Sequence, residues 1–539
     1  MERHIGIDFG TTNTVVSYRD MNGKIKKVTE SGKSSVKTAV FFKSEDDYII
    51  GEDALARGAI HPLALVTNFK PNIKGEKYEI TAEDGTTFSK KPVAIARMFL
   101  NKLLKDYIET RFSKRFNDAE LTAEDKVVVT VPVKFSPEEK KLIKKAAKKA
   151  GYPNLSLSFE PTAAAIAISE GISGRAFTGD DIIAVYDFGG GTFDISVIKK
   201  RENGTHKALR NGQNGDKKLG GNAVTKQVIK DLLLDPLEEH GIMLDIETDI
   251  TEEFEFDEDE FGVASETEYR RNWYQAKQLA EDIKTAFSEE DCLEDDFTNE
   301  NFTLYEKPVD FSIHLTREEY HKCIFPLIEQ TVELTDKTIS KTETEHGVTV
   351  NKIILVGGSS KILLVRELMR KKFTSKGIEV ISSDKPFDMI SIGAMILGEK
   401  SSSIKPEEVT PAQYGIAERE GFRLKFTPLI LENVPLPTSG KKRYPITSDM
   451  LKSHEISVRF YEKDVAAYPD AEIINRDNGL NLIDEYSISI PENCNPENAE
   501  ISFIIEEDGT IRLAVEFSDG NFNSLLKINE VMDAESDLD

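Results

Sequence analysis

The chain has 539 residues and a formal net charge of −26 at pH 7. This length exceeds what one hydrophobic core supports, so we predict two or more globular domains. The acidic excess argues against nucleic acid and against an anionic membrane surface as partners, since both are bound through clustered Lys and Arg.

The sequence also predicts a cytoplasmic location. No run of 18 apolar residues is present, so no membrane-spanning helix is expected. The N-terminus enters a predicted strand at once, without the basic and apolar regions of a signal peptide. Cys292, Cys323 and Cys494 are scattered, and their spacing suits neither a disulfide framework nor a metal site.

The chain begins with a predicted strand–turn–strand segment, Ile5–Val16 (IGIDFGTTNTVV). Asp8 lies near the end of the first strand, and a glycine with three small polar residues follows. Such a turn brings the backbone close to a ligand and points its N–H groups inward, as phosphate binding requires. The turn residues are Gly10, Thr11, Thr12 and Asn13.

Residues 1–180 are predicted as a first lobe. Lys70 lies in a loop-like segment, VTNFK, where an ordinary surface lysine is the alternative reading. A helix is predicted over Pro92–Phe112, because a proline opens it and apolar residues recur at helical spacing. Ser136–Glu139 forms a capping box at the start of another helix. Glu160 precedes a proline and an alanine-rich helix.

Residues 181–400 are predicted as a second lobe. A similar strand–turn–strand segment occurs there at Tyr186–Val197 (YDFGGGTFDISV), directly after an apolar strand. Three consecutive glycines allow a sharp turn that can cradle phosphate oxygens. The alternative is a glycine-rich hairpin without a ligand, since short glycine motifs often occur without one. The candidate residues here are Asp187, Gly189, Gly190, Gly191, Thr192 and Asp194.

Further elements follow in the second lobe. Leu219-Gly220-Gly221 is a turn, a helix is predicted over Tyr269–Ser288, and Thr316–Glu319 is a second capping box. Asp245–Glu260 contains ten acidic residues and no Lys or Arg. We interpret it as a solvated loop or helix face, with a cation site as the less favoured alternative. Ile353–Ser360 (IILVGGSS) is a strand that leads into two glycines and a helix.

The Asp-Phe-Gly motif that the two hairpins share indicates an internal repeat. Two such hairpins facing each other would hold a polyphosphate from both sides. Two phosphate hairpins followed by a strand–Gly-Gly–helix unit are typical of the actin-like ATPase fold, an α/β fold with two duplicated RNase H-like lobes.

From about residue 401 the sequence changes character. Residues 401–410 are polar and contain proline, as linkers often do. Over 411–530 apolar residues alternate with period two, and Asp508-Gly509 is a hairpin signal, so an all-β sandwich-like domain is predicted. The acidic end, residues 531–539, is predicted to be disordered.

These segments resemble the heat shock protein 70 (DnaK-type) chaperone family in order and wording. IGIDFGTTNTVV, FEPTAAAIA, YDFGGGTFDISV, KLGGN and LVGGSSKI cover the ATPase part, and EVTPAQYGI, FTPLI and NVPLP resemble the start of the family's substrate-binding β-domain. The resemblance implies ATP or ADP with Mg²⁺, and K⁺ as a further ion. It also implies unfolded or extended peptides, J-domain co-chaperones and nucleotide exchange factors as partners.

The resemblance also carries residue roles. Lys70 matches the lysine that positions the attacking water, Glu160 and Asp187 match carboxylates of the Mg²⁺–water shell, and Thr192 joins them as a catalytic candidate. Asp8, Asp187 and Asp194 are the candidate metal residues, mostly through water. The implied nucleotide-binding residues are Gly10, Thr11, Thr12, Asn13, Gly189, Gly190, Gly191, Thr192, Gly220, Gly221, Glu281, Lys284, Ser288, Gly357, Gly358, Ser359 and Lys361.

The sequence departs from the family at several positions. Thr285 and Lys361 replace arginines that sandwich the adenine, and Phe387 replaces an aspartate near the adenosine, so we expect nucleotide to bind differently or more loosely. Ser156 replaces an arginine that contacts J-domains. The linker lacks the aspartate–leucine signature, and no helical lid follows the β-domain, so we expect weak coupling between domains and little dependence on J-domains.

The leading prediction is an ATPase that drives a chaperone cycle, with the β-domain holding extended apolar peptide. An ATP-binding holdase or adaptor with weak coupling is the alternative. A small-molecule kinase of the same superfamily is less favoured, since the site offers Lys70 and water-shell acids rather than a carboxylate base for an acceptor hydroxyl.

Overall fold

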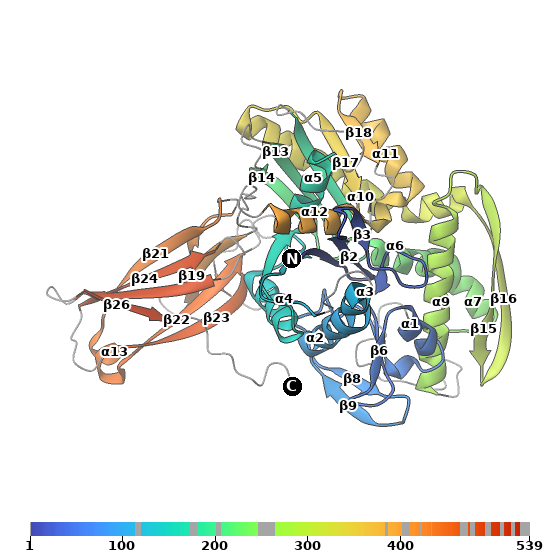
Figure 1. Cartoon of the computed structure of the whole chain (residues 1–539), viewed down its shortest axis with the longest axis horizontal. Coiled ribbons are helices and arrows are strands. Elements are labelled where there is room, and N and C mark those ends of the chain that lie inside the picture. The colour runs from blue at the N-terminus through green and yellow to red at the C-terminus, as the bar shows by residue number, and fades with distance from the viewer. Residues whose placement is uncertain are drawn as a thin grey trace.

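A computed structural model shows how the chain folds (Figure 1). It describes residues 2–113, 120–171, 181–200, 206–245, 265–382, 386, 388–400, 410, 412–420, 423–432, 434–463, 473–474, 480–490, 497–506, 511–518 and 523–528. Several predicted features lie outside these residues. They are the linker 401–409, nearly all of the acidic run, Phe387, Cys494, the Asp508-Gly509 turn and the tail 531–539.

The first sheet carries the first hairpin. Its strand order is β11 (Leu155–Phe159), β10 (Lys126–Val131), β1 (His4–Phe9), β2 (Asn13–Arg19) and β3 (Ile25–Lys27), with β4 (Val36–Lys37) also paired to β2. The strands β11, β10 and β1 run parallel, whereas β1 and β2 are antiparallel. Because β1 is an inner and mostly buried strand, the turn that follows it lies at the carboxyl end of a strand held on both sides.

The second sheet repeats this pattern. Its order is β14 (His206–Asp216), β13 (Phe193–Lys200), β12 (Ile182–Phe188), β17 (Lys352–Val356) and β18 (Glu379–Ser382). Here β12 and β13 form the antiparallel hairpin, and β12, β17 and β18 run parallel. The strand predicted before the three glycines is β12, and every residue of it is buried.

Two apolar helices lie between the sheets. They are α5 (Glu160–Ser169) and α12 (Asp388–Glu399), and in each of them the described residues are almost all buried. Close packing needs small residues here: a Cβ on Gly6 or on Gly393 would collide with the backbone of Ser391 or Ala163. The two helices thus hold the two sheets, and the hairpins they carry, at a fixed separation.

Smaller elements complete the first lobe. Its outer strands are β5 (Val40–Phe42), β6 (Tyr48–Ile50), β7 (Leu65–Val66), β8 (Tyr78–Thr81) and β9 (Thr87–Lys90). Its helices are α1 (Glu52–Gly58), the 3-10 turn Pro62–Ala64, α2 (Pro92–Lys102), the π-helical segment Leu103–Glu109, α3 (Thr110–Ser113) and α4 (Pro137–Lys149). The predicted helix Pro92–Phe112 is therefore three consecutive helical segments, and the capping box of α4 is present as predicted.

The second lobe is completed in the same way. Its helices are α6 (Gly221–Val228), the π-helical segment Ile229–Leu233, α7 (Leu234–Glu239), α9 (Glu266–Ala286), α10 (Arg317–His346), the 3-10 turn Gly358–Lys361 and α11 (Leu363–Thr374). A two-stranded ribbon of β15 (Glu294–Leu304) and β16 (Lys307–Thr316) lies beside α9 (Figure 1). The helix predicted over Tyr269–Ser288 begins three residues earlier, at Glu266 after the cap Ser265, and ends at Ala286. The Thr316–Glu319 capping box is present.

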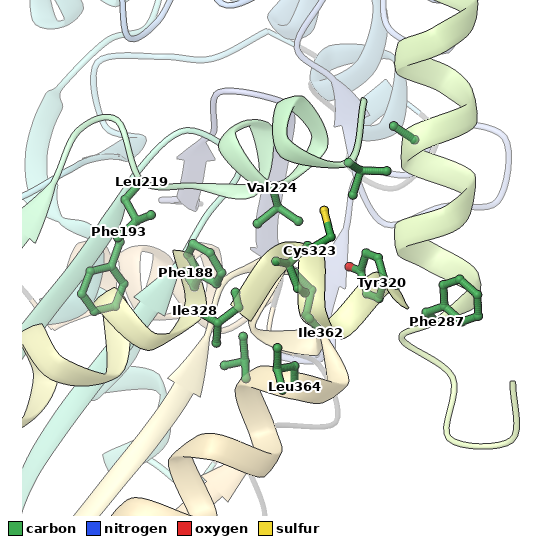
Figure 2. Packing of buried hydrophobic residues seen from close by; sticks show 14 of the residues in the cluster. Phe188, Phe193, Leu219, Val224, Phe287, Tyr320, Cys323, Ile328, Ile362 and Leu364 are labelled. Atoms are coloured by element: carbon green, nitrogen blue, oxygen red, sulfur yellow. The ribbon is translucent and has the colours of Figure 1, made fainter. Parts of the chain in front are cut away.

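A large apolar cluster supports the second hairpin from behind (Figure 2). Phe188 and Phe193 flank the glycine turn and pack edge to face at 6.2 Å between ring centroids. Leu219 and Val224 contribute from the next turn and from α6, and Ile328 contributes from α10. The glycine turn therefore packs against a dense apolar core, which fixes the positions of its backbone N–H groups.

The C-terminal region contains two four-stranded antiparallel sheets. One is β20 (Arg423–Ile430), β19 (Gln413–Glu420), β22 (Glu455–Lys463) and β23 (Leu480–Ser489), and the other is β21 (Thr438–Pro445), β24 (Asn498–Ile505), β25 (Ile511–Ser518) and β26 (Asn523–Ile528). The short helix α13 (Ser448–Ser453) leads into β22. One core cluster contains residues of both sheets, so the two sheets pack face to face. This β-domain lies beside α4 (Figure 1).

Among the described residues, no helix is both long and apolar enough to cross a membrane.

Candidate functional site

The two glycine–threonine hairpins face each other across the two lobes. A Cβ on Gly190 would lie 2.5 Å from Oγ1 of Thr12, and a Cβ on Gly191 would lie 2.5 Å from Oγ1 of Thr11. Only glycine fits at this approach, since real Cβ atoms do not come so close. The predicted juxtaposition of the two turns is therefore present in the fold, although the turns are separated by nearly the whole first lobe.

Two further turns join the second hairpin. The backbone N–H of Gly221 donates to the carbonyl of Gly189 at 2.9 Å, and the N–H of Asn222 donates to Gly190 at 2.7 Å. The hydroxyl of Ser359 donates to the same Gly189 carbonyl at 2.8 Å. A Cβ on Gly357, which has a φ of +80°, would lie 2.5 Å from Oδ1 of Asp187. Glycine-rich backbone from three separate segments thus converges on one place.

Lys70 lies in the same place, deep in the protein. Its ammonium donates to Oε1 of Glu160 at 2.8 Å, and the side chains are 3% and 9% exposed. The lysine also lies over the rings of Phe9 and Phe135, each at 5.7 Å from the ring centroid. The alternative reading of Lys70 as an ordinary surface lysine is therefore wrong.

Three aspartates surround this ion pair. Burial, followed by the charge of Glu160, raises the pKa of Asp8 to about 7, and the same two causes raise the pKa of Asp194 to about 7. Burial and the charges of Glu160, Asp194 and Asp8 raise the pKa of Asp187 well above its ordinary value. Within the protein alone the carboxylates repel one another, as expected where a cation is to be bound.

The free oxygens of these aspartates fit a hard cation. Oδ2 of Asp187 and Oδ1 of Asp194 are buried and have no hydrogen-bond partner among the described residues. Across the same part of the chain, no three His, Cys, Asp or Glu side chains are close enough to hold a metal directly. Oxygen donors set back from the centre suit Mg²⁺, which keeps several of its waters.

The side of the site predicted to contact the nucleoside lies on α9. The ammonium of Lys284 donates to Oε1 of Glu281 at 2.6 Å, to the hydroxyl of Thr225 at 2.8 Å and to the carbonyl of Gly221 at 3.2 Å. This network connects α9 to α6 and to the turn that contacts the second hairpin. Glu281 and Lys284, which the family resemblance implied as nucleotide contacts on one helix, thus lie next to the Gly220-Gly221 turn.

A cleft of about 1140 Å³ opens between the lobes in front of these residues. It is lined from the first lobe by Thr11 and Thr12 and from the second by Asn222, Glu281 and Thr285. Thr285, which the family resemblance predicts to lie at the adenine, lines this cleft. A cleft of this size is large enough for a nucleoside triphosphate.

Among the predicted nucleotide-binding residues, Thr11, Thr12 and Glu281 line the cleft, whereas the others, Ser288 and Lys361 included, do not. The hydroxyl of Ser288 donates to the carbonyl of Lys284 at 2.7 Å, and the Lys361 side chain is exposed on a 3-10 turn. Neither residue lines the cleft, although both lie within one turn of residues that reach the site.

Sequence reasoning missed several residues. Asn222 donates to Oδ1 of Asn68 at 3.1 Å, which joins the lobes, and it directly follows the predicted Gly220-Gly221 turn. Tyr274 donates to the carbonyl of Leu55 at 3.1 Å from α9 to α1. Tyr274 could have been found, because it precedes Glu281 by seven residues and so lies on the same helix face.

Two comparisons bear on these observations. The chain matches the model of the Hsp70 protein family over residues 4–529. It is 28% identical over 525 residues to the chaperone protein DnaK of Mycoplasma mobile, an alignment that covers 95% of this chain and 76% of that relative. The match spans the hairpins, the glycine turns, α9 and the β-domain alike. The chain therefore belongs to the Hsp70 family.

Proposed function

We propose that this Hsp70 protein hydrolyses ATP at the convergence of the two hairpins and uses the β-domain to hold extended apolar peptide. Members of the family are ATPases and ATP-dependent chaperones, so this chain is an ATPase and a chaperone. The residue assignments, the cation and the peptide site are the proposal. The observation that carries it is the buried ion pair of Lys70 and Glu160 beside opposed glycine turns.

The phosphate end follows from the chemistry of phosphoryl transfer. Backbone N–H groups of the turns at Gly10–Asn13 and Gly189–Thr192 would bind the phosphate oxygens, and Thr11 and Thr12 would add hydroxyl donors. Transfer to water needs an oriented nucleophile, and the Lys70 ammonium, which donates to Glu160, would orient it. Gly220, Gly221, Gly357, Gly358 and Ser359 would shape the wall behind the phosphates.

Mg²⁺ would be held by Asp8, Asp187 and Asp194, mostly through its waters, and it would neutralise phosphate charge. The unpartnered oxygens of Asp187 and Asp194 support this assignment. Asp8 accepts a hydrogen bond from the hydroxyl of Thr130 at 3.3 Å, which orients its carboxylate. A role for K⁺ stays a prediction that comes from the family resemblance.

A second apolar cluster in the β-domain supports the peptide site. Phe426, Tyr461 and Leu480 pack together with Ala417 and Ile474, separately from the sandwich core. Strand pairing places the small residues Gly415 and Ala417 opposite Tyr461 and Phe426, and Gly415 is buried against the Phe426 ring. An extended peptide could lie over this face with its apolar side chains against the cluster.

Unfolded peptides and co-chaperones are partners of the family in general. We expect little dependence on J-domains because of Ser156, and a cytoplasmic location remains a sequence-based prediction. The decisive experiment is single-turnover ATP hydrolysis with and without a panel of unfolded apolar peptides. Stimulation by peptide supports the coupled chaperone. Hydrolysis that is indifferent to bound peptide supports the holdase.

A further inference from the structure

Among the described residues, the β-domain meets the first lobe through charged groups, and no apolar cluster contains residues of both. Lys134, two residues before the cap of α4, lies 3.8 Å from Glu432 of the β-domain, and their side chains are 12% and 18% exposed. On the ATPase side of this contact, Glu139 and Lys140 of α4 are buried. On the β-domain side, Glu462 and Lys463 at the end of β22 are buried as well.

Glu462 occupies an unusual position for a carboxylate. It pairs with Tyr414 across β19 and β22, and Ile416 pairs with Phe460 two residues along the strands. Because side chains alternate along a strand, Glu462 is on the same face as Tyr414 and Phe460, which belong to the sandwich core. The hydroxyl of the fully buried Tyr414 has no hydrogen-bond partner among the described residues. Glu462 therefore lies at the boundary of the sandwich core, on the side that faces the ATPase domain.

The charges that act on Glu462 come mostly from the other domain. Lys217, Lys74 and Lys140 attract its carboxylate, and Glu139 repels it. Most of these charges are already paired within the ATPase domain. Oε2 of Glu139 accepts from the backbone N–H of Ser136 at 2.6 Å and from Lys217 at 2.8 Å.

The remaining cations are engaged in the same way. Lys74 lies 2.5 Å from Oε2 of Glu138, and Lys140 lies 4.2 Å from the ring centroid of Phe159. On the β-domain side, Tyr414 pairs with Glu462 across the strands, the buried Lys463 follows it in the chain, and the charge of Glu432 acts on Tyr414. The lysines are thus only partly available to compensate a second buried carboxylate.

We propose that Glu462 is a proton-dependent clasp between the β-domain and the ATPase domain: the docked arrangement takes up a proton on this carboxyl, so docking strengthens as the pH falls from about 8 to about 6. A neutral carboxyl can be buried at the end of the core at little cost, and its O–H can donate a hydrogen bond. An ionised one keeps little of its water, since Glu462 is 9% exposed, and Lys217 and Lys74 are already paired with other glutamates.

The direction of this dependence follows from linkage. Burial raises the pKa of Glu462 to about 7 in the docked protein, against the ordinary value of 4.5 that we expect once separation of the domains returns the carboxylate to water. A raised pKa means that docking is favoured below the ordinary value and loses this contribution as the pH rises through 7. Between pH 8 and pH 6 the docking constant should therefore increase about tenfold.

The test measures docking in the full chain by small-angle X-ray scattering at pH 8, 7 and 6, without added nucleotide. We expect the unmodified protein to become more compact as the pH falls. Glu462→Gln, which has the same shape and no charge, should be compact at all three pH values. Glu455→Gln is the matched control, because Glu455 is an exposed glutamate at the other end of the same strand.

A second variant tests the clasp without changing Glu462. Lys217→Met removes the cation that attracts the carboxylate most strongly, so the pH at which the domains separate should rise. Asp8 and Asp194 also titrate near pH 7, but they are intact in Glu462→Gln, which separates their effect from that of Glu462. The proposal is wrong if the unmodified chain has the same dimensions at pH 6 and pH 8. It is equally wrong if Glu462→Gln keeps the pH dependence or Lys217→Met leaves the midpoint unmoved.

Discussion

The ammonium of Lys70 lies 2.8 Å from the carboxylate of Glu160, ninety residues further along the chain, and both side chains are almost completely buried. Truncating either partner of a buried pair leaves an uncompensated charge. The pair therefore both positions Lys70 and ties the loop that carries it to the start of α5.

Lys70→Ala should lower the single-turnover rate of ATP hydrolysis by about 10²-fold or more, because the ammonium acts on the nucleophile in the transition state. ATP affinity should stay within a few-fold. Quench-flow measurements with radiolabelled ATP would give the rate, and calorimetry would give the affinity. Lys24→Ala, at an exposed turn, is the control. An unchanged rate in Lys70→Ala would remove this lysine from the chemistry.

Asp187→Asn should have opposite effects on the free and the nucleotide-bound protein. Without nucleotide the melting temperature should rise, because the substitution removes one of several buried, mutually repelling carboxylates. The stabilisation that Mg·ADP gives to the unmodified protein should largely disappear. Thermal melts with and without Mg·ADP test both halves, with Asp47→Asn on the surface as control. Melting curves that match the unmodified protein in both conditions would contradict the metal assignment.

Binding of Mg·ADP should strengthen with pH near neutrality. Asp8 and Asp194 have pKa values of about 7 in the protein, against an ordinary 3.8, so they are partly protonated at pH 6 and must ionise to bind the cation. Affinity should rise by at least about tenfold from pH 6 to pH 8, as calorimetry can measure. Asp8→Asn should bind more weakly and show a shallower dependence. A flat profile in the unmodified protein would rule out this linkage.

Tyr274→Phe should accelerate nucleotide release. The hydroxyl of Tyr274 donates to the carbonyl of Leu55 across the mouth of the cleft, and a hydrogen bond of this kind contributes about 1 kcal/mol. Dissociation of a fluorescent ADP should become about fivefold faster in stopped-flow experiments. Tyr305→Phe, which changes an exposed tyrosine, should release ADP at the unmodified rate. Equal rates for the two variants would show that this bond does not restrain the lobes.

Ala417→Glu should weaken peptide binding by the β-domain. The substitution puts a carboxylate on the face formed by Phe426 and Tyr461, where an apolar peptide would have to desolvate it. Fluorescence anisotropy of a labelled apolar peptide should show a Kd raised by about tenfold or more, while ATP hydrolysis without peptide stays the same. Glu516→Gln on the other sheet is the control. Unchanged peptide affinity would place the site elsewhere on the domain.

Much of the local structure was predictable from the sequence. The two hairpins, the capping boxes at Ser136 and Thr316, and the turn at Gly220-Gly221 depend on neighbouring residues, so their signals are local. The candidate roles of Lys70 and Glu160 came from the family resemblance, and the fold brings the two together. Helix bounds were less predictable: α9 begins at Glu266 because Ser265 caps it, not at the first large apolar residue.

The tertiary structure alone decided which distant residues meet. Asn222 and Asn68, or Tyr274 and Leu55, join the lobes only because α5 and α12 fix the distance between the two sheets. Glu462 shows the same limit most clearly. By its type it would be expected at the surface, yet strand register and the neighbouring domain place it in a buried position. Period, caps and turns are determined within a few residues, whereas burial and charge environment depend on contacts between segments far apart in the sequence.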